Sequence, residues 1–164
     1  MKTIAYPLAA IGLFLSLSAA AQTTTDDKTM GLAERRIVKS FQDGEFQELT
    51  KEANEAAGKT LKYEVNWEQL AEEESSHLYA DSWPQIYFEP LIQALKDITA
   101  DDMGKEAIKE GLETVVIRNQ EGCYSPDCWA NFTNKTLTLD HKLANVSEVD
   151  ARAKELQATL ENGL

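Results

Sequence analysis

Cysteine and histidine are scarce in this chain, since each occurs only twice among 164 residues. A structural zinc site needs four ligands, usually cysteine and histidine, so two cysteines cannot supply one alone. The sequence also lacks G-x-S-x-G, H-E-x-x-H, G-x-x-x-x-G-K-[ST] and G-x-G-x-x-G. These patterns mark nucleophilic serines, zinc proteases and nucleotide-binding loops. We therefore expect neither a metal site nor a cofactor.

Basic residues are also few relative to acidic ones. The chain has 16 Lys and Arg against 28 Asp and Glu, which gives a formal net charge of −12. A polyanion is repelled by nucleic acid and by anionic membrane surfaces. The charge excludes a nucleic-acid partner and leaves two alternatives, a basic partner or a merely well-solvated surface.

A long hydrophobic run occurs only at the beginning of the chain. Lys2 precedes an apolar stretch that is densest from Leu8 to Leu17, and Ala19-Ala20-Ala21 forms an A-x-A site before Gln22. A membrane-spanning helix needs about 20 apolar residues, and this run is shorter. The pattern is typical of a secretory signal peptide, and no cysteine follows the cleavage site to accept a lipid.

We therefore divide the chain into a signal peptide at 1–21, a polar, disordered lead-in at 22–29 and a single domain at 30–164. The mature chain is expected in the periplasm or outside the cell, without stable insertion into a membrane. The compact leader favours a bacterial origin. The sequons at Asn131, Asn134 and Asn145 would matter only in a eukaryotic secretory pathway.

Hydrophobic periodicity predicts the elements of the domain. Helical spacing covers 30–57, with a break at Gly44 and an end at Gly58, and returns in 82–98, 101–111 and 148–161. Helix starts are expected at Asn66, Ser82, Asp101 and Ser147, and Pro90 predicts a second start or a kink. Alternating or β-branched segments at 60–67, 114–119, 128–133 and 136–143 predict strands, the last two joined as a hairpin by Asn134-Lys135. We expect an α+β fold, a single domain with a mostly antiparallel sheet of about four strands packed against several helices.

Both cysteines lie in one short segment, EGCYSPDCW. Cys123 and Cys128 are separated by four residues, which is too long for a C-x-x-C redox motif. In an oxidising compartment such neighbours pair. We predict a disulfide across a turn at Ser125-Pro126-Asp127, contributing about 2 kcal/mol. A reactive thiol pair is the alternative.

The two histidines are the candidate catalytic residues. His141 falls on the same alternating face as Leu137, Leu139 and Leu143, so it is either a hydrogen-bonded core residue or part of a pocket. His77 follows Glu73 and Glu74 by four and three residues. If the helix continues there, the three side chains share a face and can form an acid–base pair or a metal half-site. An exposed acidic helix end is the simpler interpretation.

Aromatic residues near the cysteines suggest a binding surface. Tyr124 and Trp129 flank the predicted disulfide loop, and Trp83 lies among prolines and other aromatics. Exposed aromatics anchor interfaces, whereas buried ones build the core. We therefore predict an exported acidic binding domain whose partner is a protein or a small ligand. The alternatives are an exported hydrolase that uses His141 or His77, and an accessory envelope protein without a discrete site.

Overall fold

The computed structural model describes residues 30–72 and 75–164. The predicted signal peptide at 1–21, the lead-in at 22–29 and the pair Glu73–Glu74 lie outside the described residues. The helices are α1 (Leu32–Asp43), α2 (Glu45–Ala57), α3 (Trp67–Leu70), η1 (Ser76–Leu78), α4 (Tyr79–Trp83), η2 (Pro84–Phe88), α5 (Glu89–Ile98), α6 (Asp102–Gly111) and α7 (Val149–Gly163). The strands are β1 (Lys62–Val65), β2 (Thr114–Arg118), β3 (Ala130–Thr133) and β4 (Thr136–Asp140).

The four strands form one mixed sheet in the order β1-β2-β4-β3. β1 pairs with β2 in parallel, β2 pairs with β4 in parallel, and only β3 and β4 are antiparallel. The α+β class and the four-stranded sheet are confirmed. The prediction of a mostly antiparallel sheet is wrong.

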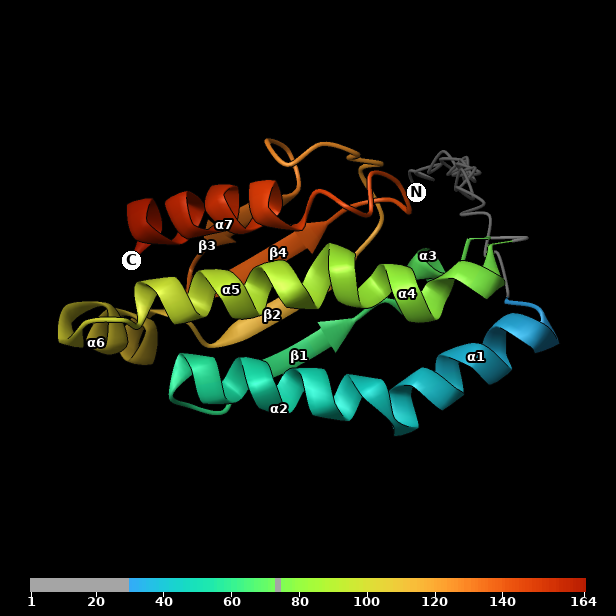
Figure 1. The fold of residues 1–164 in the computed structure, drawn as a ribbon, viewed down its shortest axis with the longest axis horizontal. Coiled ribbons are helices and arrows are strands. Elements are labelled where there is room, and N and C mark those ends of the chain that lie inside the picture. The colour runs from blue at the N-terminus through green and yellow to red at the C-terminus, as the bar shows by residue number, and fades with distance from the viewer. Residues whose placement is uncertain (1–29, 73–74) are drawn as a thin grey trace, which may run out of the picture.

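The connections explain the parallel pairing. The chain between β1 and β2 passes through the helices from α3 to α6 and returns to the same end of the sheet (Figure 1), as a crossover between parallel strands must. The hairpin then places β3 at the sheet edge, so β4 lies between β2 and β3. The hairpin itself was predicted correctly, but not the strand that β4 joins.

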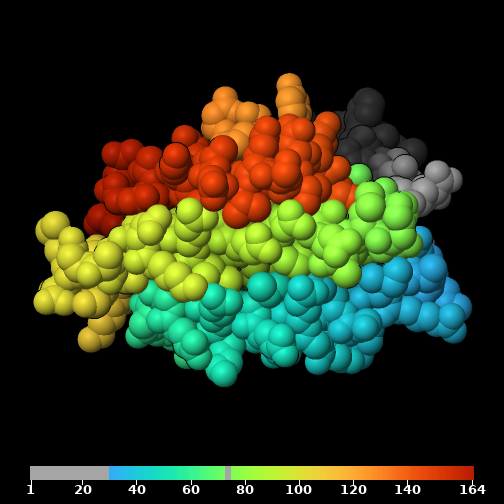
Figure 2. All heavy atoms as spheres, in the orientation of Figure 1, coloured from blue at the N-terminus to red at the C-terminus, as the bar shows by residue number. Residues whose placement is uncertain are grey.

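The helices form a layer on one face of the sheet. Figure 1 shows α2, α5 and α7 side by side across that face, and α5 contacts both neighbours. In the space-filling view of Figure 2, side chains close the spaces between these three helices. No helix in the described ranges is long and apolar enough to span a membrane.

Several local predictions are confirmed. Gly58 ends α2 with φ at 66°, a left-handed conformation that glycine adopts without steric cost. The side chains of Asn66 and Asp101 each accept a hydrogen bond from the backbone N–H three residues on, and so begin α3 and α6. Asn134 and Lys135 join β3 to β4 with φ of 50° and 64°, as a two-residue hairpin requires.

Some helix starts differ from the prediction. A start was expected at Ser82 and a second start or a kink at Pro90, but the helix is continuous from Tyr79 to Ile98 and contains a π-helical turn, η2, just before Pro90. Proline lacks the N–H that a regular α-turn would use, and a π-turn changes the local hydrogen-bond pattern without ending the helix. Ser147 does not cap α7, whose first flanking residue is Glu148.

The core lies between the helical layer and the inner face of the sheet. Along β2 and β4, buried Val115, Ile117, Leu137 and Leu139 alternate with half-buried residues. The outer face instead carries polar side chains, including exposed Lys62 and Glu64 on β1. The sheet therefore has one apolar face and one polar face.

Candidate recognition site

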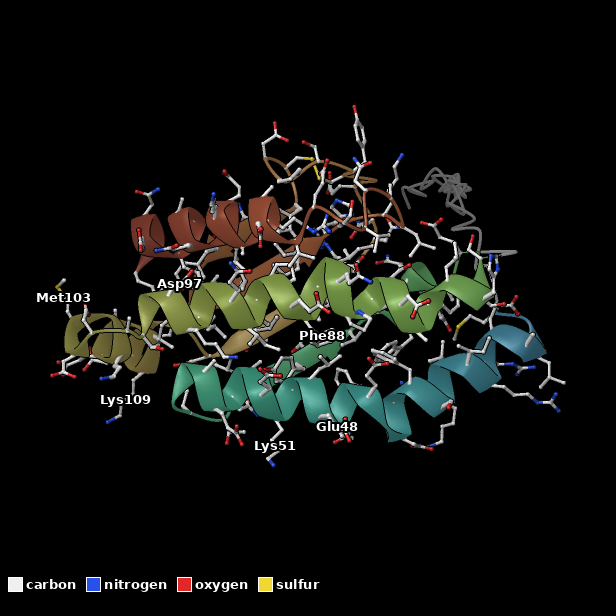
Figure 3. All side chains as sticks on the ribbon, viewed as in Figure 1. Glu48, Lys51, Phe88, Asp97, Met103 and Lys109 are labelled. Carbon is white, nitrogen blue, oxygen red and sulfur yellow. A yellow bond between two sulfur atoms is a disulfide. The ribbon has the colours of Figure 1, made fainter. Side chains whose placement is uncertain are left out.

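The connection between β2 and β3 is a loop closed by the two cysteines. Cys123 and Cys128 form a disulfide with their Cα atoms 5.9 Å apart, as predicted. Figures 1 and 3 show this orange loop, with its yellow sulfur–sulfur bond, projecting beyond α7 at the top of the view. The turn inside the ring is held by a hydrogen bond from the Cys128 N–H to the Ser125 carbonyl at 3.3 Å. A disulfide is the form that cysteines take in an oxidising compartment.

The first residues of the loop are held by the carboxylate of Asp140, at the end of β4. One carboxylate oxygen accepts hydrogen bonds from the backbone N–H groups of Gln120 and Glu121, at 2.9 and 3.1 Å. The other oxygen accepts from Arg118 Nε at 2.7 Å. Asp140 is 5% exposed. Hydrogen bonds to a charged group in such a position are stronger than neutral ones, so the start of the loop is fixed.

The middle of the loop is held by the segment that follows β4. The Lys142 N–H donates to the Cys123 carbonyl at 2.8 Å, and Asn145 Nδ2 donates to the Tyr124 carbonyl at 2.8 Å. Lys142 Nζ lies 4.8 Å from the centre of the Tyr124 ring, within the range of a cation–π contact. The Tyr124 side chain is nevertheless 58% exposed. The loop thus presents a solvent-facing aromatic ring on a restrained backbone.

The two tryptophans predicted for binding lie in the interior, each 1% exposed. Trp129 follows the disulfide loop, and its ring meets that of His141 edge to face with centroids 6.4 Å apart. Trp83 stacks on Tyr79 at 4.4 Å within the aromatic part of the core. The structure therefore places Trp129 next to the loop and separates Trp83 from it. Of the three predicted residues, only Tyr124 reaches the surface.

His141 is completely buried, as its place on the apolar face predicted. Its Nδ1 lies within hydrogen-bonding distance of the Lys142 carbonyl. A carbonyl only accepts, so Nδ1 carries the proton. Burial lowers the pKa of His141, and the nearby positive charge of Arg152 acts in the same direction. The neutral imidazole is a constituent of the core beneath the segment that holds the loop.

His77 is exposed in the short helix η1. Its predicted partners Glu73 and Glu74 lie outside the described residues, so the proposed acid–base pair cannot be placed. Within the described ranges, no group of three or more His, Cys, Asp or Glu side chains is arranged to hold a metal ion. Neither histidine lines the cleft at Trp67 or the three smaller clefts that border α2.

Two buried polar side chains that sequence reasoning missed attach this region to the helical layer. The Tyr87 hydroxyl donates to the carbonyl of His141 and lies 3.4 Å from that of Arg118. Arg152 is fully buried, and its guanidinium donates to the carbonyls of Asn145 and Val146 at 3.0 and 2.7 Å. Burial lowers the pKa of Arg152 and raises that of Tyr87.

Arg152 had a recognisable signal in the sequence. It lies directly before Ala153 and four residues before Leu156, so it falls on the apolar face of α7. A charged residue there must find buried partners. The partners are carbonyl groups, which a sequence does not reveal.

No protein-family model, curated protein or solved structure matches this chain. The arrangement of the loop therefore has to be interpreted from its own chemistry. That chemistry is a covalently closed turn, a buried carboxylate that fixes the start of the loop, and one exposed aromatic ring. Among the described residues these features coincide only at the β2–β3 connection.

Proposed function

We propose that this protein is an exported recognition domain that binds a protein partner through the disulfide loop, with Tyr124 as the central contact. The proposal depends on one observation: the ring of Tyr124 is 58% exposed although its backbone is held on both sides. A side chain that is already ordered loses little entropy on binding. Tyrosine is also one of the residues that contribute most to protein interfaces.

The charge around the loop supports a partner with basic groups. Glu121 and Asp127 are exposed on the loop, and the whole chain carries a net charge of −12. Such a surface accelerates association with a positively charged protein and repels other polyanions. Export is supported by the leader and by the paired cysteines.

The hydrolase alternative receives no support from the position of either histidine. His141 is enclosed and is bonded to a neighbouring carbonyl, so a substrate at the surface does not reach its ring. His77 is exposed, but it lines neither the cleft at Trp67 nor the three smaller clefts that border α2. A general acid or base must lie within hydrogen-bonding reach of its substrate.

Site-specific photocrosslinking in the exporting cells tests the proposal. A benzophenone amino acid replaces Tyr124 in the full-length chain, and the same group at Met103 is the control. Met103 is 80% exposed and projects from α6 at one end of the molecule (Figure 3). We expect a discrete adduct from position 124 and none of the same mass from position 103.

Competition distinguishes specific binding from chance contact. Excess purified wild-type protein should suppress the adduct from position 124. A Tyr124→Ala competitor should need at least a tenfold higher concentration for the same suppression. Tyr124→Ala is expected to change the free energy of unfolding by about 0.5 kcal/mol or less because the ring is exposed. Identical adducts from both positions, no adduct, or equal competition would contradict the proposal and favour the accessory protein without a discrete site.

A further inference from the structure

A cleft of about 740 Å³ lies where β1 and β2 end, and it reaches Gln120 at the start of the disulfide loop. Residues of α1 form one wall, the turn from β1 into α3 forms another, and the end of β2 forms the third. β1 and β2 are parallel neighbours, so their carboxyl ends open into the same place. In open α/β sheets, ligands bind at the carboxyl ends of parallel strands. The volume is in the range of small-molecule sites.

The apolar part of the cleft is built around Trp67. Val38, Val65 and Val116 also line the cleft, and the Trp67 ring packs against Phe46 with centroids 5.4 Å apart. Trp67 is half-buried, unlike the other two tryptophans of the chain, which are 1% exposed. The cleft thus offers a fixed aromatic surface to a ligand with an apolar body.

Three cations line the same cleft, although acidic residues dominate the chain. Arg35 and Lys39 are four residues apart on α1 and therefore share one helical face. Arg118 comes from the end of β2. The acidic side chains lining the cleft are Glu64 and Glu68. Two of the three cations already have an acidic partner, because Lys39 pairs with Asp43 and Arg118 with Asp140.

Arg118 is held in position by its contact with Asp140. The Nε atom donates to the Asp140 carboxylate at 2.7 Å, and Asp140 is itself fixed by two backbone N–H groups. This pairing uses one edge of the guanidinium, and the Arg118 side chain remains 33% exposed. An arginine fixed through Nε retains other N–H donors in the fork that suits a carboxylate.

From this juxtaposition we propose that the cleft binds a small organic carboxylate with an apolar body. The apolar group lies against Trp67 and Val38, and the carboxylate pairs with Arg118, Arg35 and Lys39. This site is separate from the proposed protein-binding loop, and either can fail without the other. The two are adjacent in one respect, because Asp140 holds both Arg118 and the beginning of the loop.

Acrylamide quenching of tryptophan fluorescence measures occupation of the cleft. Trp67 is the one tryptophan that solvent reaches to a substantial degree, so a ligand in the cleft shields it. The probes are 4-phenylbutyrate and the neutral 4-phenyl-1-butanol, which share the aromatic body and differ in the charged group. We expect 4-phenylbutyrate to protect Trp67 saturably at millimolar concentration or below, and the alcohol to bind at least tenfold more weakly.

Matched double variants test the role of the cations. Arg35→Gln with Lys39→Gln should weaken 4-phenylbutyrate at least tenfold. Lys51→Gln with Lys109→Gln makes the same charge change on exposed positions remote from the cleft (Figure 3) and should leave affinity within twofold. Circular dichroism verifies that both variants are folded.

Trp67→Phe locates the signal. In this variant the ligand-dependent protection should disappear, while the emission of buried Trp83 and Trp129 remains. Any of four results would overturn the proposal: no saturable protection by 4-phenylbutyrate, equal binding of the alcohol, equal weakening by the two double variants, or protection that persists in Trp67→Phe.

Discussion

The Asp140 carboxylate accepts a hydrogen bond from Arg118 Nε at 2.7 Å, and this pair connects the two surfaces of interest. The other carboxylate oxygen holds the backbone of Gln120 and Glu121 at the start of the disulfide loop. The arginine lines the cleft at the ends of β1 and β2. One nearly buried carboxylate therefore restrains both a loop that presents an aromatic ring and a cation that faces a cleft.

Replacing Asp140 by Asn should lower the free energy of unfolding by about 2 kcal/mol. The substitution preserves the shape of the side chain but removes the charge that three donors share, and hydrogen bonds to charged groups contribute about 1.5–3 kcal/mol. Urea denaturation at pH 7 measures the change. Glu121→Gln is the control, because Glu121 is exposed and lies 4.0 Å from Arg118; its effect should stay below about 0.5 kcal/mol. Equal losses would refute this account of Asp140.

Removing the disulfide with Cys123→Ser and Cys128→Ser should cost about 2 kcal/mol, as expected for so short a ring. The core and sheet should remain, because Asp140 and Lys142 still hold the loop backbone. Denaturation of the double variant, and of wild-type protein reduced with dithiothreitol, should show the same loss of unfolding free energy. Loss of the far-ultraviolet circular dichroism spectrum at 25 °C would show that the ring is needed for the fold itself.

The stability of the protein should fall as the pH decreases below 6.5, in part through His141. Burial holds its folded-state pKa below the ordinary value of 6.5, so the unfolded state takes up a proton first. Neutral His141 makes its full contribution to the free energy of unfolding above pH 6.5. That contribution is lost as the pH falls from 6.5 to the folded-state pKa, by no more than about 1.4 kcal/mol per pH unit. His141→Gln should flatten the slope of unfolding free energy between pH 7.5 and 5.5.

His77→Gln provides the control for the pH experiment. His77 is exposed, and this variant should retain the wild-type slope. Carboxylates contribute equally to both histidine variants, so the difference between the two slopes isolates His141. A wild-type slope in His141→Gln would contradict the conclusion that His141 contributes to the pH dependence of stability.

Arg152→Met should cost about 3 kcal/mol, because the carbonyls of Asn145 and Val146 lose a buried donor and each such loss costs about 1–3 kcal/mol. Thermal and urea denaturation both measure it. Lys154→Met, on the exposed side of the same helix, should change stability by less than about 0.5 kcal/mol. Similar effects of the two substitutions would show that the Arg152 hydrogen bonds contribute little.

Local features were predictable because their causes are local. Gly58 ends a helix, Asn66 begins one, and Asn134-Lys135 forms a hairpin turn. Each of these features depends on the backbone conformation of the residue itself and on hydrogen bonds to residues a few positions away. The cysteine pair was predictable for the same reason, since its members are five positions apart. The role of Asp140 was not, because its partners lie 19 to 22 residues away.

The pattern of residues by itself determined which segments are helices or strands, which faces are apolar, that His141 faces inward and that the cysteines can meet. Tertiary structure alone decided that β4 pairs in parallel with β2, that Trp129 is enclosed while Tyr124 is exposed, and that Asp140 joins the loop to the cleft. The reason is the range of the interactions. Helix caps and turns act over three or four residues, whereas strand order and buried polar contacts depend on how the helical layer closes over the sheet.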